Sequence, residues 1–242
     1  MELKDSSRHL VAIMFTDIVG YTSMMQRDEH AAMEAVRQHQ EILQRLVHAH
    51  HGEVHNYYGD GSLSLFTSAT QAMLCALEMQ KQLLQEPRVL VRIGIHIGEI
   101  YIEGGKIFGD GVNIASRIES IGQGGAVLFS KDVFEKTKNH HEFHTMSIGK
   151  FDFKNVDETI EVYALTNPEV VTPDLKLIEG KLKVVPKKKK WSVELILSIL
   201  VLVLTAGYFL ALQPNSSSAG IDELETNKSI AVLPFKNLSV GE

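Results

Sequence analysis

Two aspartates in the N-terminal part of the sequence have the chemistry of a metal site. Asp17 follows an apolar run in "HLVAIMFTDI" (9–18), and Asp60 lies between two glycines in "NYYGDGSLSLF" (56–66). The first stretch reads as a largely buried strand, and the second as a tight hairpin with Asp60 at its tip. If these strands are neighbours, both carboxylates project at one end of a sheet, where their repulsion is costly without a cation.

Mg²⁺ or Mn²⁺ would relieve that repulsion, because both ions prefer hard oxygen ligands. Two such ions bridged by two carboxylates are a known arrangement for displacement at phosphorus. The alternative is a capping aspartate and a turn aspartate, and both are common in proteins. The two residues alone do not decide between these interpretations.

A second pair of polar residues follows in "KIFGDGVNIASRIES" (106–120), where Asn113 and Arg117 are four positions apart. On a helix this spacing puts both side chains on one face. An arginine there could stabilise charge that develops on a transferring phosphoryl group, and a neutral amide could orient a sugar. The alternative is an ordinary helix surface with a solvated arginine.

The elements that would position these residues alternate between strand and helix patterns. After the first strand we expect a helix over 28–50, the Asp60 hairpin, a helix over 68–84, a second hairpin over 89–105 that turns near Gly98, a short helix within 109–122, a strand and a helix between 126 and 137, and strands near 145–154 and 160–165. This order predicts an α+β fold with a ferredoxin-like, mostly antiparallel sheet covered by helices.

Composition excludes some classes of protein. A formal charge of −6 argues against a nucleic-acid binder, and a single cysteine, Cys75, excludes an internal disulfide. Histidines gather in "HAHHGEVH", at His48, His50, His51 and His55. They could bind zinc, but they straddle a helix end and a strand, so we expect a surface cluster.

One segment predicts a membrane span. From Leu195 to Leu212, within 191–212, 18 residues carry no charge. Their helical length of about 27 Å is close to a hydrocarbon core of about 30 Å. Four lysines at 187–190 precede the span, which places residues 1–190 in the cytoplasm, with these lysines close to anionic lipids of the bilayer.

The chain then divides into a catalytic domain over 1–166, a basic juxtamembrane tether over 167–190, a transmembrane helix over 191–212 and an extracytoplasmic part over 213–242. The last part reads as a polar linker followed by the start of an outer domain that is cut short at the end of the sequence. We therefore expect a single-pass protein of the inner (plasma) membrane.

Residues 8–166 together resemble the catalytic domain of class III nucleotidyl cyclases. The stretches "FTDIVGYT" and "YYGDGSLSLF" resemble the two metal motifs of that family, "GVNIASR" its asparagine–arginine motif, and "FKNVDETIEVYAL" its closing strands. The resemblance implies a membrane-anchored, bacterial-type adenylate cyclase. Such an enzyme makes 3′,5′-cyclic AMP and pyrophosphate when the 3′-hydroxyl of ATP attacks the α-phosphate.

The resemblance also assigns roles to residues. Asp17, the backbone of Ile18 and Asp60 would bind two Mg²⁺ or Mn²⁺ ions per active site. Asn113 would orient the ribose and Arg117 would stabilise the transition state. Lys154 falls where the family has a triphosphate-binding lysine. The family's active sites are shared across a dimer, so the resemblance implies a homodimer.

Three positions depart from the family pattern. Asn56 and Lys106 replace the usual lysine and acid that read the purine, and Glu99 stands where some members have a phosphate-binding arginine. Lys106 would donate to adenine N1 while the Asn56 carbonyl accepts from N6; alternatively, Lys106 is a solvated turn residue. Neither position has the glutamate of guanylyl cyclases, which favours ATP. The alternatives are a guanylyl or relaxed-specificity cyclase, and a silent cyclase-like module for dimerisation or signalling.

Overall fold

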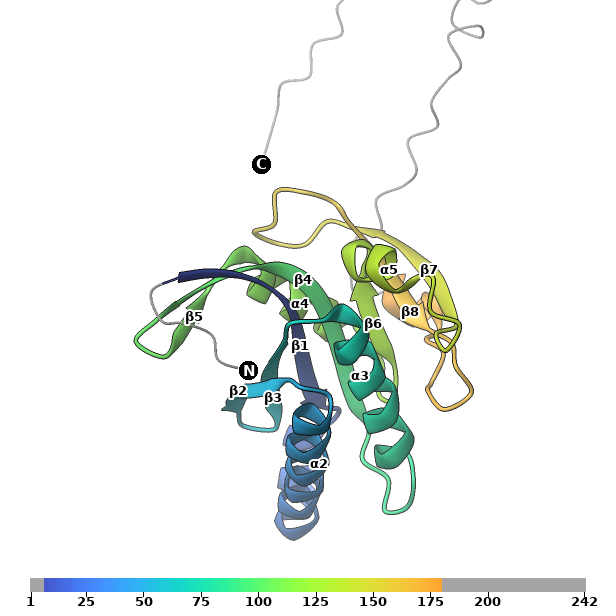
Figure 1. Ribbon diagram of the computed structural model, residues 1–242. Coiled ribbons are helices and arrows are strands. Elements are labelled where there is room, and N and C mark those ends of the chain that lie inside the picture. Colours follow the sequence, from blue (N-terminus) through green and yellow to red (C-terminus); the bar gives the residue numbers. More distant parts are fainter. Residues whose placement is uncertain (1–6, 180–242) are drawn as a thin grey trace, which may run out of the picture. The chain divides into compact units, whose positions relative to one another are not determined.

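The computed structural model describes residues 7–179, and its centre is an eight-stranded sheet (Figure 1). The strands run in the order β2-β3-β1-β4-β6-β8-β7, with β5 paired to β4. All pairs are antiparallel except β4 with β6. The strands are β1 (Ser7–Ile18), β2 (Glu53–Tyr58), β3 (Gly61–Phe66), β4 (Val91–Glu103), β5 (Lys106–Phe108), β6 (Val127–Ser130), β7 (Thr145–Phe151) and β8 (Ile160–Leu165). The helices are α1 (Tyr21–Arg27), α2 (Glu29–Ala49), α3 (Ala69–Leu83), α4 (Asp110–Ile121), α5 (Lys131–Thr137) and α6 (Leu175–Glu179).

Alternation along β1 separates the two faces of the sheet. Ala12 and Met14 belong to the hydrophobic cluster that includes residues of α2 and α3. Val11 and Ile13 belong to a second cluster that includes Ala115 of α4. Asp17 is an even number of positions from Val11 and Ile13 along β1, so its side chain projects from the same face of the sheet, the one that α4 covers. The predicted α+β fold with a mostly antiparallel sheet between helices is confirmed.

The long helices have the ends that the sequence predicts. The carboxylate of Asp28 accepts a hydrogen bond from the backbone N–H of Ala31 at 3.0 Å and caps α2. The hydroxyl of Ser68 accepts from the N–H of Gln71 at 3.5 Å and caps α3. Both expected helices are therefore confirmed, with bounds one residue inside the predicted ranges at each end.

A second hairpin is present as the antiparallel pair β4 and β5, but its predicted turn near Gly98 is wrong. Strand β4 runs without interruption from Val91 to Glu103, and the chain turns at Gly104 and Gly105, which have φ angles of 55° and 72°. Gly98 serves another purpose, because a Cβ there would lie 2.8 Å from the Cα of Gly111. The glycine at 98 thus lets α4 approach β4 closely, which a pattern of local turn residues does not reveal.

The part of the chain from 7 to 179 contains no helix that combines the length and apolar character needed to cross a bilayer. The predicted span over 191–212 and the predicted outer part over 213–242 lie outside the described residues.

Buried His96 of β4 gives a stability prediction. Its Nδ1 lies 2.8 Å from the hydroxyl oxygen of Ser130, and burial lowers its pKa to about 4, although the Asp132 carboxylate acts in the opposite direction. Between pH 6.5 and 4 the unfolded chain binds a proton that folded His96 does not. Stability from this residue is therefore present at neutral pH and falls as the pH drops through that window, by roughly 3 kcal/mol at pH 4.

Urea unfolding of the 7–179 fragment at pH 7 and pH 4.5 measures this effect. His96→Gln removes the titrating group, so the variant should lose less stability than the parent between the two pH values. Equal losses in both proteins would show that His96 contributes nothing to the acid sensitivity.

Candidate active site

The pairing of β1 with β3 brings Asp17 next to the turn that carries Asp60. Thr16 is opposite Ser62 in this antiparallel pair, so Asp17 is level with Gly61. A Cβ on Gly61 would lie 3.4 Å from Asp17 Oδ1 and 2.8 Å from the Thr16 carbonyl oxygen. The glycine therefore allows the turn to lie directly against Asp17. The expectation that the two carboxylates project at the same end of the sheet is met.

The electrostatics of this pair fit a divalent cation. Partial burial and the nearby negative charge of Asp17 raise the pKa of Asp60 above its ordinary value. A cation between the carboxylates would remove this cost, and the donor set of two carboxylates and the Ile18 backbone carbonyl consists of the hard oxygens that Mg²⁺ and Mn²⁺ prefer. Among residues 7–179, no group of three or more His, Cys, Asp or Glu side chains is arranged to hold a metal.

A buried polar network lies on the opposite face of the sheet, behind the carboxylates. The Thr16 hydroxyl lies 2.7 Å from that of Ser62 and 3.0 Å from His39 Nε2. Burial lowers the pKa of His39 to about 4, against the opposing effect of Asp17. A neutral His39 thereby fixes α2 to the ends of β1 and β3 that carry the two aspartates. Sequence reasoning missed this network, although a threonine next to Asp17 in an apolar strand was a signal.

Helix α4 exposes both Asn113 and Arg117 and buries Ala115 and Ile118. The helix lies very close to β4, since a Cβ on Gly94 would be 2.3 Å from the backbone nitrogen of Glu119. The predicted shared face of Asn113 and Arg117 is therefore present and open to solvent.

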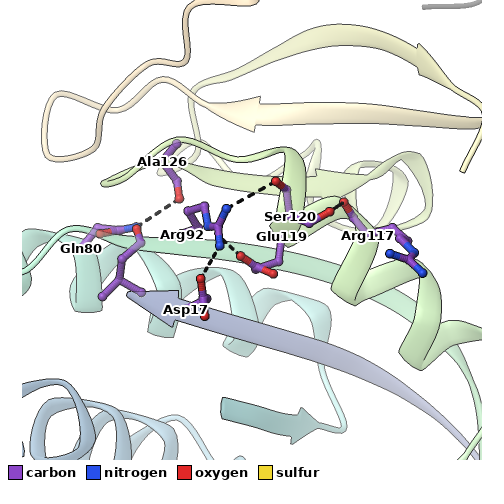
Figure 2. Close-up of polar contacts among 8 residues, drawn as sticks. Asp17, Gln80, Arg92, Arg117, Glu119, Ser120 and Ala126 are labelled. Carbon is purple, nitrogen blue, oxygen red and sulfur yellow. Dashed lines mark hydrogen bonds and ion pairs between the residues drawn. The ribbon is translucent and has the colours of Figure 1, made fainter. Parts of the chain in front are cut away.

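Within one chain, Arg117 does not approach Asp17. Figure 2 shows Arg117 beyond Glu119 and Ser120 as seen from Asp17, with its guanidinium group directed away from that carboxylate. One chain thus brings Asp17 next to the Asp60 turn, and directs Arg117 away from Asp17.

Lys154 is exposed in the turn between β7 and β8. Its neighbours Phe153 and Val156 pack in the same hydrophobic cluster as Ile114 and Ile118 of α4. The turn that carries Lys154 and the helix that carries Asn113 and Arg117 are therefore held by the same hydrophobic cluster.

The predicted purine-reading residues are exposed on different strands. Asn56 lies on β2, and its side-chain oxygen accepts a hydrogen bond from the N–H of Tyr57 at 2.9 Å. Lys106 begins β5 opposite Glu103. Glu99 makes an ion pair of 3.5 Å with Arg8, and both side chains are largely exposed.

Arg92 of β4 is a charged residue at this end of the sheet that sequence reasoning missed. It forms an ion pair with Asp17, and its Nε lies 2.8 Å from Glu119 Oε1 (Figure 2). The Nε–Oε1 contact meets the distance for an ion pair but not the angle for a hydrogen bond. The signal in the sequence was a lone arginine in the apolar stretch "VLVRIGIHI".

The clustered histidines lie at the end of α2 and at the start of the following strand. His48 and His51 are exposed, and His50 instead contacts Gln71 Oε1 at 3.1 Å and Glu78 Oε2 at 3.2 Å.

Comparisons with known proteins identify the family of the chain. Residues 3–167 match the sequence profile of the adenylate and guanylate cyclase catalytic domain. The chain is 34% identical over 240 residues to a Rhizobium meliloti protein named "Putative adenylate cyclase 3", in a match that covers 96% of this chain and 34% of that protein. The chain thus spans about a third of the length of that relative.

Two solved structures have a fold similar to that of this chain. The adenylate/guanylate cyclase/hydrolase of Silicibacter pomeroyi is 32% identical, with a TM-score of 0.60 over 67% of this chain and 99% of the other. The guanylate cyclase domain from Catenaria anguillulae, solved with GTP, has a TM-score of 0.58 at 20% identity, over 68% of this chain and 98% of the other. The chain belongs to the adenylate and guanylate cyclase family, and residues 3–167 are its catalytic domain.

Proposed function

We propose that this protein is an adenylate cyclase that converts ATP to 3′,5′-cyclic AMP and pyrophosphate at active sites shared across a homodimer. The observation that carries the proposal is the juxtaposition of Asp17 with the Asp60 turn, together with an open α4 face that carries Asn113 and Arg117. The rival interpretation, a silent cyclase-like module, would be expected to lack some of these four residues, and all four are present.

The metal side of the site would be held by Asp17, Asp60 and the Ile18 carbonyl. Two divalent ions bound there would lower the pKa of the attacking hydroxyl and neutralise charge on the triphosphate. The buried contacts of Thr16 and His39 keep the strand ends in register, so the carboxylates need little rearrangement.

The other residues act on the substrate directly. Asn113 would hold the ribose so that its 3′-hydroxyl lies in line with the α-phosphate, and Arg117 would stabilise negative charge on the oxygens of the transferring group. Lys154 would bind the triphosphate. Because one chain keeps Arg117 away from Asp17, we infer that these residues come from the second chain of an isologous dimer.

The choice of purine belongs to the proposal as well. Neither Asn56 nor Lys106 is the glutamate expected of guanylyl cyclases, which favours ATP over GTP. Purified protein incubated with Mn²⁺ and either ATP or GTP, followed by chromatography of the cyclic products, tests this directly. Cyclic GMP as the main product would replace the proposal with a guanylyl cyclase, and no cyclic product would support the silent module.

Lys106→Ala gives a narrower test of the base pocket. If Lys106 contacts adenine, its loss should raise KM for ATP about tenfold, the effect of losing roughly 1.4 kcal/mol of binding. Lys136→Ala, which removes a lysine from α5, is a matched control. Unchanged KM and an unchanged ratio of cyclic AMP to cyclic GMP would assign Lys106 to a solvated turn.

Membrane anchoring is a separate proposal that rests on the apolar stretch at 191–212 and the lysines at 187–190. Protease added to intact cells should spare the catalytic domain and cleave within 213–228. Cleavage of the catalytic domain in unbroken cells would show the opposite orientation. A protein that stays in the supernatant after ultracentrifugation of lysed cells would contradict the anchor itself.

A further inference from the structure

Arg92 lies between the two functional parts of the chain. Its Nη2 pairs with Asp17 Oδ2, its Nε lies 2.8 Å from Glu119 Oε1, and its Nη1 donates a long hydrogen bond of 3.5 Å to the Ser120 carbonyl (Figure 2). One guanidinium group therefore contacts a metal-binding carboxylate at one end and α4 at the other.

The sheet register makes the contact with Asp17 direct. Asp17 and Arg92 are opposite each other in the antiparallel pair of β1 and β4, so their side chains project on the same face. Arg92 holds Oδ2, whereas Oδ1 is the oxygen that lies toward Gly61 and the Asp60 turn. The arginine thus orients the carboxylate and leaves the oxygen next to Asp60 for a cation.

On α4, Arg92 contacts residues in the same helical turn as Arg117. The Glu119 side chain is only 11% exposed, and a buried carboxylate needs a charge partner, which Arg92 supplies. Ser120 donates from its hydroxyl to the Arg117 carbonyl at 2.8 Å. The helix backbone also lies against β4 at Gly94, two positions from Arg92, so the segment that Arg92 contacts is packed directly on the strand that carries it.

We propose that Arg92 is a positioning residue that fixes Asp17 and the last turn of α4 as one unit. The inference rests on the proposed shared-site dimer, in which Asp17 and α4 of one chain serve different active sites. Arg92 then links Asp17, which serves the metal side of one active site, to α4, which carries Arg117 for the other active site. Metal binding that orders Asp17 in one site would therefore also order α4 in the second site.

Lysine is the informative replacement. Arg92→Lys keeps the positive charge but has one nitrogen in place of the planar fork, so it cannot contact Asp17, Glu119 and Ser120 together. Loss of the fork should weaken Mn²⁺ binding about tenfold, as is typical when the partner of a metal ligand is removed. If Arg92 merely competed with the metal for Asp17, Arg92→Lys would leave Mn²⁺ binding unchanged or tighten it.

Two measurements that do not depend on activity test the contacts. Electron paramagnetic resonance titration of the whole 242-residue chain with Mn²⁺ alone reports the metal side, and hydrogen exchange of residues 110–121 reports α4. Arg92→Lys should weaken Mn²⁺ binding and speed exchange. Glu119→Gln, which keeps the size of the side chain, should speed exchange with less than a twofold change in Mn²⁺ binding. Normal exchange in both variants would overturn the proposed restraint on α4.

Coexpression tests the link between sites. If one chain carries Asp60→Ala and the other Arg117→Ala, the single whole site takes its aspartates from the Arg117→Ala chain and its α4 from the Asp60→Ala chain. Arg92→Lys placed in the Arg117→Ala chain should raise the Mn²⁺ concentration for half-maximal rate about tenfold. In the Asp60→Ala chain, Arg92→Lys should lower kcat and leave the Mn²⁺ concentration for half-maximal rate unchanged.

An effect of only the first placement would make Arg92 a local partner of Asp17 and overturn the link. An inactive parent pair that nevertheless forms heterodimers would contradict the shared site, while the Mn²⁺ and exchange measurements would still report on Arg92. The two failures are therefore distinguishable.

Discussion

Asp60→Ala protein should fold normally and show no cyclase activity above background. Without Asp60, one side-chain carboxylate remains at the metal position, and the several kcal/mol that bound metal contributes to the transition state would be lost, a decrease of about a thousandfold or more. Asp60→Asn should behave in the same way, because it keeps the shape of the side chain and removes the charge. Assays with Mn²⁺ and ATP, together with Mn²⁺ titration, measure both effects.

Asp17→Ala should be equally inactive but less stable. The Asp60 carboxylate carries a raised pKa because of burial and the charge of Asp17, so its removal relieves repulsion. Asp17, in contrast, pairs with Arg92, which would be left with Glu119 as its carboxylate partner. We expect unfolding experiments to show Asp60→Ala at least as stable as the parent at pH 7 and Asp17→Ala destabilised by about 1 kcal/mol. Near-normal activity in a folded Asp60→Ala protein would refute the metal assignment.

The sequence predicts those parts of the fold and site that depend on local patterns. Helix α2 has the apolar period and the Asp28 cap, and the Asp60 turn has its glycines, so both could be located from the residues alone. Adjacent placement of Asp17 and Asp60 required one further assumption, that β1 and β3 are neighbours, and the structure shows this pairing.

Contacts that depend on tertiary packing could not be predicted. Gly98 has the composition of a turn, but it lies within a continuous strand because α4 packs against it. Arg92 stands out as a lone arginine in an apolar stretch, but nothing in the sequence indicates its partner Asp17, which is 75 positions away. The partner of His39, Thr16, is 23 positions away. No periodicity encodes such distances, so these supporting residues appear only when the register of the sheet is known.

Arg117→Ala protein should bind Mn²⁺ normally and yet be nearly inactive. Loss of an arginine that stabilises a transferring phosphoryl group costs about a thousandfold or more in kcat, whereas the guanidinium group of Arg117 is directed away from Asp17 of its own chain. Arg117→Lys should recover little activity, because a lysine cannot reproduce the planar fork. A kcat within tenfold of the parent would remove Arg117 from the active site.

Coexpression of the two inactive chains, Asp60→Ala and Arg117→Ala, should restore activity. In an isologous dimer the mixed pair has one doubly altered site and one whole site. Random pairing makes about half of the dimers mixed, each with one working site of two, so roughly a quarter of the parent activity should return. Chains with different affinity tags allow the mixed dimers to be isolated, and their activity should be about half that of the parent. Isolated mixed dimers without activity would show that one site does not combine Asp60 of one chain with Arg117 of the other.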